Sequence, residues 1–327
     1  MKTNNPKFSV VIPCYNEAEN ILVLYEQLLM VFMDLGVTYE CVFVDDGSDD
    51  GTLDIIKEIA ETNSNLKYIS FSRNFGHQKA LIAGLCVARG EGVITMDADL
   101  QHPVRILPRF LDLWKEGYEV VNTLRTDKKS LGRFKRTTSA LFYSVMNLLT
   151  GLKLQQGSAD FRLLDAKVVA IIRESKEDNL FLRGMICWYG FKQTNIVYQA
   201  DERHAGTTKF SLCKMMSLAL NGVTSFTIKP LRLATVLAGC FALFSLIEIG
   251  YVFYTACFTH HAVSGWSSLA ILISLLGAVT LLMLGIVGEY VGRAFMQGKG
   301  RAAYIIAQTN VDDMPTEDTP KKVCHER

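Results

Sequence analysis

Hydrophobic and polar positions alternate between two patterns along residues 8 to 99 of the chain. Short apolar runs that are typical of buried strands occur at 8–13, 39–45, 66–71 and 92–96. Longer segments with apolar residues at helical spacing lie between them, at 18–36, 51–63 and 77–90. Strands that alternate with helices in this way form βαβ units. The pattern therefore predicts an α/β domain with a largely parallel sheet.

Polar residues follow each of the four expected strands. These clusters are "YNE" at 15–17, "DDGS" at 45–48, "RNFGH" at 73–77 and "DADLQ" at 97–101. Ligands of open α/β sheets bind beyond the carboxyl ends of the strands, so four such clusters outline one site. Neither GxGxxG nor GxxxxGK[ST] follows the first strand, which argues against a dinucleotide fold and against a P-loop.

Asp45 and Asp46 begin the second cluster, and two interpretations of them stay open. Their carboxylates could accept hydrogen bonds from ribose hydroxyls or from the edge of a base. Alternatively, they form a turn and a helix cap, which are positions that Asp and the following Ser48 favour in any protein. A cap explains one of these residues better than it explains all of them.

Asp97 and Asp99 end the fourth strand, in "VITMDADLQHP" at 93–103. Residues two apart on a strand point to the same side, so both carboxylates can serve one ligand. Oxygen ligands suit Mg²⁺ or Mn²⁺, and Mg²⁺ typically takes one or two protein carboxylates together with phosphates and water. The pattern predicts a divalent cation site, with a solvated loop start as the alternative.

Two long apolar segments follow, at 233–258 and 267–288. The first would form a helix of about 39 Å and the second carries no charge, so both are expected to span a bilayer. Glu248 in the first would face a partner helix or a polar cavity, or would lie near the far interface. The loop at 259–266 has no Lys or Arg, whereas basic residues flank the pair at 229, 232, 293, 299 and 301, so both ends are expected in the cytoplasm.

These boundaries divide the chain into a cytosolic domain at 1–228, a membrane hairpin at 229–300 and a cytosolic tail at 301–327. Amphipathic segments near 130–150 and 210–227 are expected to lie in the membrane interface, with packing against the sheet as the alternative. The polar, Pro-containing stretch at 312–327 is typical of a disordered tail.

The net charge and the cysteine pattern argue against a nucleic-acid-binding protein and against a zinc or redox protein. A net charge of +1 gives no case for nucleic-acid binding. The eight cysteines are scattered singly, with no CxxC pair that would indicate zinc or redox chemistry. The apolar run at 8–12 is too short for the core of a secretory signal, so the first domain is expected to stay in the cytosol.

Six motifs together resemble one enzyme family. They are "VVIPCYNEAENI", "VDDGSDDGT", "SRNFGHQKALIAGL", "DADLQHP", "ADFRLLD" and "RHAGTTKF". Their order and spacing, over residues 8 to about 305, resemble glycosyltransferase family 2, in the polyprenyl-phosphate branch that holds bactoprenol glucosyltransferases and dolichyl-phosphate mannosyltransferases. The resemblance implies an α/β, Rossmann-like GT-A domain followed by a two-helix transmembrane hairpin.

The resemblance also implies a reaction. It is the inverting, metal-dependent transfer of a hexose, with glucose from UDP-glucose as the best match, to undecaprenyl or another polyprenyl phosphate for O-antigen modification. The partners are then a nucleotide sugar, the lipid phosphate and the cytoplasmic membrane, with Mg²⁺ or Mn²⁺ as cofactor. Transfer of mannose or a modified sugar is one alternative, and a non-catalytic lipid carrier is another. A processive polysaccharide synthase is a weaker one, because the chain has no QxxRW motif. Two spans per chain leave room for a homo-oligomer.

Roles of single residues carry over from the matching motifs. Asp160 and Asp99 would be catalytic, and Asp97, Asp99 and Gln101 would face the cation. Arg203 and Lys209 would bind the lipid phosphate. The nucleotide sugar would be lined by Pro13, Tyr15, Asn16, Glu17, Asp46 and Asp97, with Asp45 beside them. Two positions depart from the family pattern. Related sequences often have Asp at the position of His102, and they usually have Gly at the position of Ala159.

The chemistry of the acceptor changes what Asp160 must do. A phosphate monoester has a second pKa of about 6 and is largely ionised near neutral pH, so a strong general base is unnecessary. Asp160 is therefore expected to position or electrostatically guide the reacting groups as much as to accept a proton. A purely structural pairing with nearby Arg162 is the alternative.

Overall fold

The computed structural model describes residues 6–126, 147, 151, 155, 157–175, 182–199, 227–258, 265–311 and 323–324. The chain divides into two compact units, one comprising Met1–Met216 with Arg301–Arg327 and the other comprising Ser217–Gly300. Each unit is described by itself.

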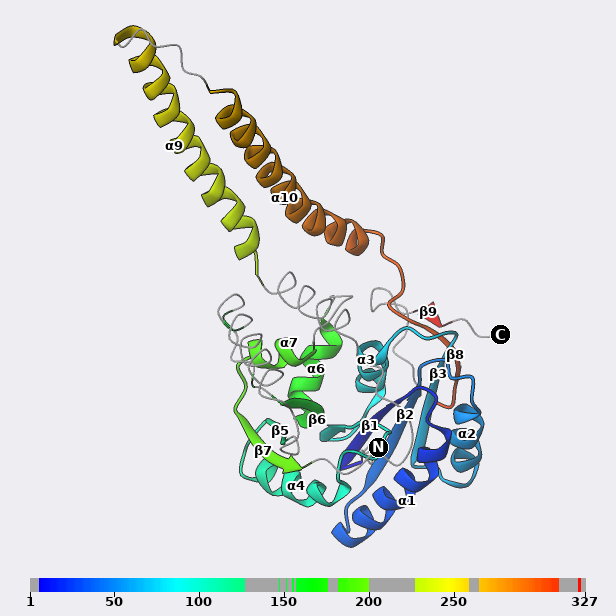
Figure 1. Cartoon of the computed structure of the whole chain (residues 1–327). Helices are drawn as coiled ribbons and strands as arrows, with labels where there is room; N and C mark the ends of the chain where they lie inside the picture. The colour runs from blue at the N-terminus through cyan, green and yellow to red at the C-terminus, as the bar shows by residue number, and fades with distance from the viewer. Residues whose placement is uncertain are drawn as a thin grey trace. The chain divides into compact units, whose positions relative to one another are not determined.

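The first unit begins with the expected alternation of strands and helices (Figure 1). In chain order these elements are β1 (Phe8–Cys14), α1 (Ala18–Leu35), β2 (Tyr39–Asp45), α2 (Thr52–Thr62), β3 (Leu66–Phe71), α3 (His77–Val87) and β4 (Gly92–Thr95). The elements that follow are η1 (Val104–Ile106), α4 (Leu107–Lys115), β5 (Val120–Thr126), β6 (Ser158–Asp165), α6 (Ala166–Glu174), α7 (Leu182–Trp188) and β7 (Gln193–Gln199). Two more strands, β8 (Ile305–Thr309) and β9 (Val323–Cys324), follow residue 300.

The strands form one sheet in the order β7-β5-β6-β4-β1-β2-β3-β8-β9. Strands β4, β1, β2 and β3 are mutually parallel, so their carboxyl ends share one edge. Strand β6 runs antiparallel to both β4 and β5. The α/β architecture with a mostly parallel sheet is therefore confirmed.

Apolar side chains cover both faces of this sheet. Successive strand residues point to opposite faces, so Val10 and Ile12 pack with α1, α2 and α4, whereas Val11 and Val44 pack with α3, α6 and α7. Strand β1 is buried at every position. Burial on both faces explains why the central strands are continuous apolar runs rather than alternating ones.

The segment after residue 300 corrects the expectation of a tail over 301–327. Strand β8 pairs antiparallel with β3. Asn310 continues the ladder with its side chain, whose Oδ1 accepts from the Tyr68 N–H at 2.7 Å and whose Nδ2 donates to the Leu66 carbonyl oxygen at 3.0 Å. Tyr304 is buried in the core on the α3 side. Sequence analysis did not predict this strand, although its apolar run at 302–307 is as long as the run at 66–71, because its partner β3 lies more than two hundred residues earlier in the chain.

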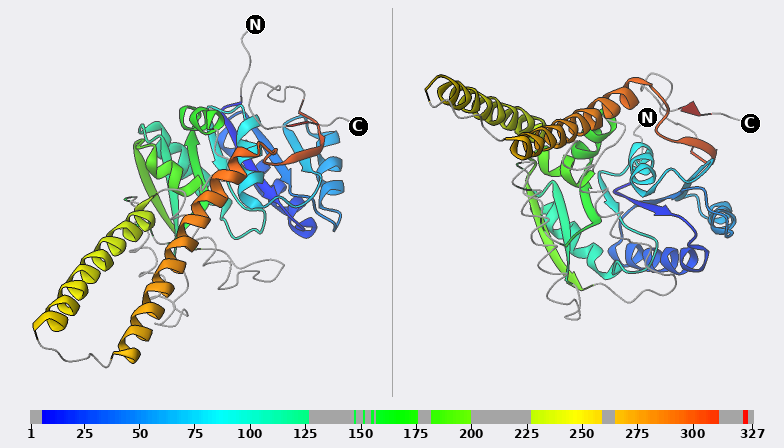
Figure 2. Two further views of the ribbon diagram at one scale, coloured as in Figure 1. Left: turned by 90° about the horizontal axis from the view of Figure 1, so that it is seen from above. Right: turned by 45° about the horizontal axis from the view of Figure 1, so that its top comes forward.

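The second unit contains two long helices, α9 (Lys229–Phe258) and α10 (Trp266–Gly298), which run alongside each other in Figure 1 and in the left view of Figure 2. They contain the two predicted apolar segments, so the helical hairpin is confirmed. Within the described residues, Leu275–Gly298 is the one stretch long and apolar enough to cross a membrane, with a mean hydropathy of 1.8 and none of its apolar window buried. Thr235–Tyr251 in α9 is a shorter apolar helix.

Sequence-based expectations for the side chain of Glu248 fall outside what the structure describes. The same holds for the amphipathic segments near 130–150 and 210–227, almost all of whose residues lie outside the described ranges.

Candidate active site

The loops that follow β1 and β2 are tied to each other. The Asn16 N–H donates to Ser48 Oγ at 3.0 Å, and Asn16 Oδ1 accepts from the Asp49 N–H at 3.0 Å. The Glu17 N–H donates to Thr52 Oγ1 at 2.9 Å. Asn16 has a φ of 56°, in the left-handed region that Asn tolerates better than most residues. These contacts fix the "YNE" cluster at the carboxyl end of β1.

Asp45 and Asp46 are both buried and both hold loop backbone or side chains. Asp45 Oδ2 accepts from Ser70 Oγ at 2.8 Å. Asp46 Oδ1 accepts from the Phe75 N–H at 2.7 Å, and Asp46 Oδ2 accepts from the Gly76 N–H at 2.9 Å. Both carboxylates thus have structural partners, as the turn-and-cap interpretation requires. Their contact with a ribose or a base stays a prediction.

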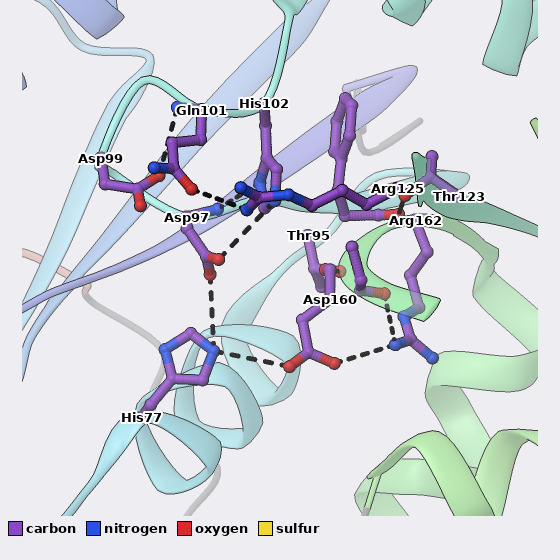
Figure 3. Close-up of polar contacts among 12 residues, drawn as sticks. His77, Thr95, Asp97, Asp99, Gln101, His102, Thr123, Arg125, Asp160 and Arg162 are labelled. Atoms are coloured by element: carbon purple, nitrogen blue, oxygen red, sulfur yellow. Dashed lines mark hydrogen bonds and ion pairs between the residues drawn. The ribbon is translucent and has the colours of Figure 1, made fainter. Parts of the chain in front are cut away.

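The loop after β4 folds back on its own side chains (Figure 3). The Asp97 N–H donates to His102 Nδ1 at 3.0 Å. Leu100, between these residues, has a φ of 58°. In the described part of the chain, Leu100 and Asn16 are the non-glycine residues with positive φ, and both lie in loops that the sequence assigns to the site. Such backbone strain clusters at functional sites, where the surrounding structure enforces it.

Asp97 and Asp99 supply oxygen atoms that fit a hard divalent cation. Asp97 Oδ1 is buried and makes no hydrogen bond to the described residues, although His77 Nε2 lies 3.5 Å away. Asp99 Oδ1 accepts from the Gln101 N–H at 3.2 Å, and Gln101 Oε1 accepts from Arg125 Nη1 at 2.7 Å. No three His, Cys, Asp or Glu side chains converge on one point within the described ranges. Two carboxylates suit Mg²⁺ or Mn²⁺ with phosphates and water as further ligands. Gln101 as a ligand stays a prediction.

His102 supports Asp97 from two directions. Its ring lies over Phe161, with centroids 4.9 Å apart and planes 9° apart, and its side chain is 5% exposed. Because Nδ1 accepts the Asp97 N–H, the ring proton lies on Nε2, which is 3.7 Å from Asp97 Oδ2. The residue that departs from the family pattern therefore contacts both the backbone and the carboxylate of the first aspartate.

Asp160 reaches the same edge because β6 runs antiparallel to β4, with Arg162 opposite Thr95. Asp160 Oδ1 accepts from Arg162 Nη2 at 2.8 Å and from Arg183 Nε at 3.0 Å. Asp160 Oδ2 accepts from Arg183 Nη2 at 2.9 Å. Arg162 is 1% exposed, so its buried charge depends on this pairing. Figure 3 shows Asp160 between His77 and Arg162.

Opposite charges control the ionisation of Asp160 and His77. Burial alone would raise the pKa of Asp160, but Arg183, His77 and Arg162 hold it well below its usual range. Burial alone would lower the pKa of His77, but Asp97 and Asp160 raise it to about 9. His77 Nε2 lies 3.8 Å from Asp160 Oδ2, and the His77 side chain is 43% exposed, so solvent screens this pair. Asp160 is thus a carboxylate held by cations and poorly suited to take a proton.

The predicted site residues have different outcomes. Asp97, Asp99, Gln101 and Asp160 lie close together in Figure 3. Pro13 and Tyr15 lie at the carboxyl end of β1 and just beyond it, and their contact with a nucleotide stays a prediction. The proposed phosphate contacts, Arg203 and Lys209, lie outside the described residues.

Sequence analysis assigned no role to His77, Arg125 or Arg183. Arg183 carried a weak signal, because it is the one charged residue in the otherwise apolar helix α7. Charged residues are almost never buried unpaired, so such an arginine indicates a partner elsewhere in the chain. His77 ends the "RNFGH" cluster, which was assigned to the site without individual roles.

Comparison with known proteins gives two family matches. Residues 9–172 match Glycosyl transferase family 2, and residues 229–294 match the GtrB C-terminal hairpin. The chain is 40% identical over 303 residues to the uncharacterized glycosyltransferase YkcC of Bacillus subtilis, covering 93% of this chain and 94% of that protein. It is 37% identical over 300 residues to the prophage bactoprenol glucosyl transferase homolog of Escherichia coli, covering 92% and 98%. It is 38% identical over 301 residues to the bactoprenol glucosyl transferase of Shigella phage SfV, covering 92% and 98%.

The metal-free protein is expected to keep the His77 imidazole protonated up to a pH of about 9. Because this pKa exceeds the ordinary value of 6.5, the His77 contacts contribute stability fully below pH 6.5 and lose it as the pH rises through about 9. Asp160→Asn removes one of the two carboxylates and is expected to lower the pKa toward 6.5. NMR titration, with the signal assigned through His77→Gln, measures both values. A wild-type pKa near 6.5 would contradict the geometry.

Replacing His102 by Ala is expected to weaken Mn²⁺ binding about tenfold, because residues that orient a metal ligand typically matter by about that factor or more. His102→Asn is the matched control, since its Oδ1 can accept the Asp97 N–H near the position of Nδ1. The His102→Asn variant is expected to keep most of the wild-type affinity for Mn²⁺. Electron paramagnetic resonance of free Mn²⁺ gives the dissociation constants. Equal affinity of wild type and the Ala variant would exclude His102 from the cation site.

Proposed function

The chain belongs to glycosyltransferase family 2, and from this membership we propose that it transfers glucose from UDP-glucose to undecaprenyl or another polyprenyl phosphate. The observation that carries the proposal is similarity along both parts of the chain. Relatives named as bactoprenol glucosyl transferases match 92% of it, and the hairpin has its own family match. The product would be a lipid-linked glucose that serves as a sugar donor in O-antigen modification.

Asp97 and Asp99 would hold Mg²⁺ or Mn²⁺ beside the donor diphosphate. The cation would stabilise the negative charge that grows on the diphosphate as the glycosidic bond breaks. The loops at 15–17 and 45–48 end neighbouring parallel strands of the same sheet, which supports their assignment to the nucleotide. The chain would contribute these two carboxylates, with Gln101 as a further predicted ligand, and phosphate and water would supply the others.

Asp160 would act through its charge and position. The acceptor phosphate is largely ionised near neutral pH, so its oxygen can attack without a strong base. The Asp160 carboxylate orients Arg183 through two hydrogen bonds and lies close to His77. These cations, together with Arg203 and Lys209, would guide the phosphate oxygen to the anomeric carbon, opposite the leaving diphosphate, with inversion.

Both ends of the hairpin would lie on the cytoplasmic side. Strand β3 precedes the hairpin in the sequence and β8 follows it, yet the two strands are neighbours in one sheet. A chain that leaves this sheet and returns to it must cross a membrane an even number of times. The basic residues that flank the hairpin favour the cytoplasm for that side.

Purified full-length protein with undecaprenyl phosphate is expected to release UDP from UDP-glucose when Mg²⁺ or Mn²⁺ is present, and to stop when EDTA is added. A panel of UDP-glucose, UDP-galactose, UDP-N-acetylglucosamine and GDP-mannose, with mass spectrometry of the lipid product, identifies the sugar.

The Asp97→Asn variant is expected to lose most of the transfer activity, because the cation then loses a ligand. If the lipid product carries mannose, the proposed sugar changes from glucose to mannose. No lipid product with any donor would favour a non-catalytic carrier.

Asp160→Asn is expected to lower kcat about hundredfold, the typical effect of removing one electrostatic group from an active site. The loss should be similar at every pH, because the change removes a fixed charge and not a titrating base. Asp112→Asn, at an exposed position of α4, is the matched control and should keep wild-type activity. A fully active Asp160→Asn variant would remove Asp160 from the mechanism. A deficit that shrinks steadily with rising pH would instead indicate a general base.

A further inference from the structure

Strand β8 is hydrogen-bonded to β3 at the point where β3 ends and the loop at 72–76 begins. The Ser72 N–H donates to the Ile305 carbonyl oxygen at 3.0 Å. The pairing register shifts between Ser70 and Phe71, just before this contact. At the other end of β8, Thr309 Oγ1 donates to the Tyr68 carbonyl oxygen at 2.7 Å. The beginning of β8 is therefore bonded to the first residue of the loop that leads to His77.

A row of three aromatic rings, Tyr304, Phe71 and Phe75, connects the residue that precedes β8 to the middle of this loop. Tyr304 stacks on Phe71 with centroids 4.8 Å apart and planes 18° apart. Phe71 contacts Phe75 edge to face, with centroids 5.7 Å apart. Tyr304 is 4% exposed and Phe71 3% exposed, so the stack is part of the core and not a surface contact. Such pairs contribute beyond their buried area because ring quadrupoles favour these orientations.

Phe75 in turn belongs to the backbone that places His77. The Phe75 and Gly76 N–H groups both donate to the Asp46 carboxylate. Gly76 has a φ of 105°, and His77 directly follows it as the first residue of α3. A shift of Phe75 would therefore move the peptide units that set the distance from His77 to Asp160.

Close packing limits the loop from the other side. A Cβ at Gly47 would lie 2.5 Å from the backbone carbonyl carbon of Arg73, so the loop backbone lies directly against the turn after β2. The Arg73 guanidinium lies over the Phe75 ring, 4.0 Å from its centroid. The loop thus contacts both the β2 turn and the aromatic row, and both contacts restrict its position.

We propose that Tyr304 is a positioning residue: through Phe71 and Phe75 it sets the backbone of residues 72–77 and thereby the place of His77 in the active site. The segment that follows α10 in the sequence would then supply a side chain on which the geometry of the catalytic edge depends. The effect on sugar transfer rests on the proposed function, whereas the effect on the loop does not.

Tyr304→Leu in the full-length protein keeps an apolar side chain and removes the stacked ring. Amide hydrogen exchange over 72–77 is expected to accelerate roughly three- to tenfold, the factor that corresponds to one aromatic pair. The amides of β1 and β2 should keep their rates. Tyr304→Phe retains the ring and is expected to behave as wild type. Tyr39→Leu removes a ring stacked on Phe32 at the opposite end of β2, with centroids 4.6 Å apart, and should leave exchange over 72–77 unchanged.

Transfer kinetics with UDP-glucose and undecaprenyl phosphate test the consequence. Tyr304→Leu is expected to lower kcat about tenfold while both KM values stay within about twofold, because displaced catalytic groups slow chemistry more than they weaken binding. Tyr304→Phe and Tyr39→Leu should keep wild-type kcat. Unchanged exchange over 72–77, exchange accelerated equally in β1, or unchanged kcat would each overturn the positioning role. Wild-type protein inactive with every donor would overturn the proposed function, and loop exchange would still decide whether Tyr304 positions the loop.

Discussion

The pairing of the Asp160 carboxylate with two guanidinium groups organises the catalytic edge of the sheet. Asp160 and Arg162 are buried two residues apart on β6, and a single buried charge left without its partner typically costs about 3 to 5 kcal/mol. Arg183 from α7 and both His77 and Gln78 from α3 also contact this carboxylate. Three elements that are distant in sequence must therefore meet at one place for the charges to be compensated. The antiparallel pairing of β6 with β4 places Asp160 beside the loop that carries Asp97 and Asp99.

Sequence patterns were sufficient for the parallel half of the sheet and its polar edge. Apolar runs alternating with helical segments define βαβ units, and parallel strands place their carboxyl ends together, so Asp97 could be assigned to the site without coordinates. The half of the sheet that contains β5, β6 and β7 was harder to predict from the sequence. Strand β6 is antiparallel, so only the observed register of Arg162 opposite Thr95 shows why Asp160 lies near Asp97. Pairing between β3 and β8 spans more than two hundred residues and leaves no periodic signal.

Backbone conformation was a second limit of sequence analysis. Leu100 adopts a left-handed φ although it is neither Gly nor Asn, and nothing in its residue type indicates this. Its conformation follows from the neighbours that fix the loop, including the hydrogen bond from the Asp97 N–H to His102. His102 could be recognised as a departure from a family pattern, but its role as an acceptor stacked on Phe161 depends on geometry. The identities of the site residues were thus easier to predict than the contacts that orient them.

The order of the strands along the chain has a consequence for biogenesis. Strand β8 is synthesised after both hairpin helices, so the outer edge of β3 has no β8 to pair with while the hairpin is still being translated. Unpaired sheet edges are templates for wrong association, and the nascent domain carries one throughout this interval. The edge closes once the segment after α10 has left the ribosome. In a chain stalled or cleaved within the hairpin this edge of β3 would stay without β8, so the β3–β8 pair can form only in molecules whose hairpin has been made in full.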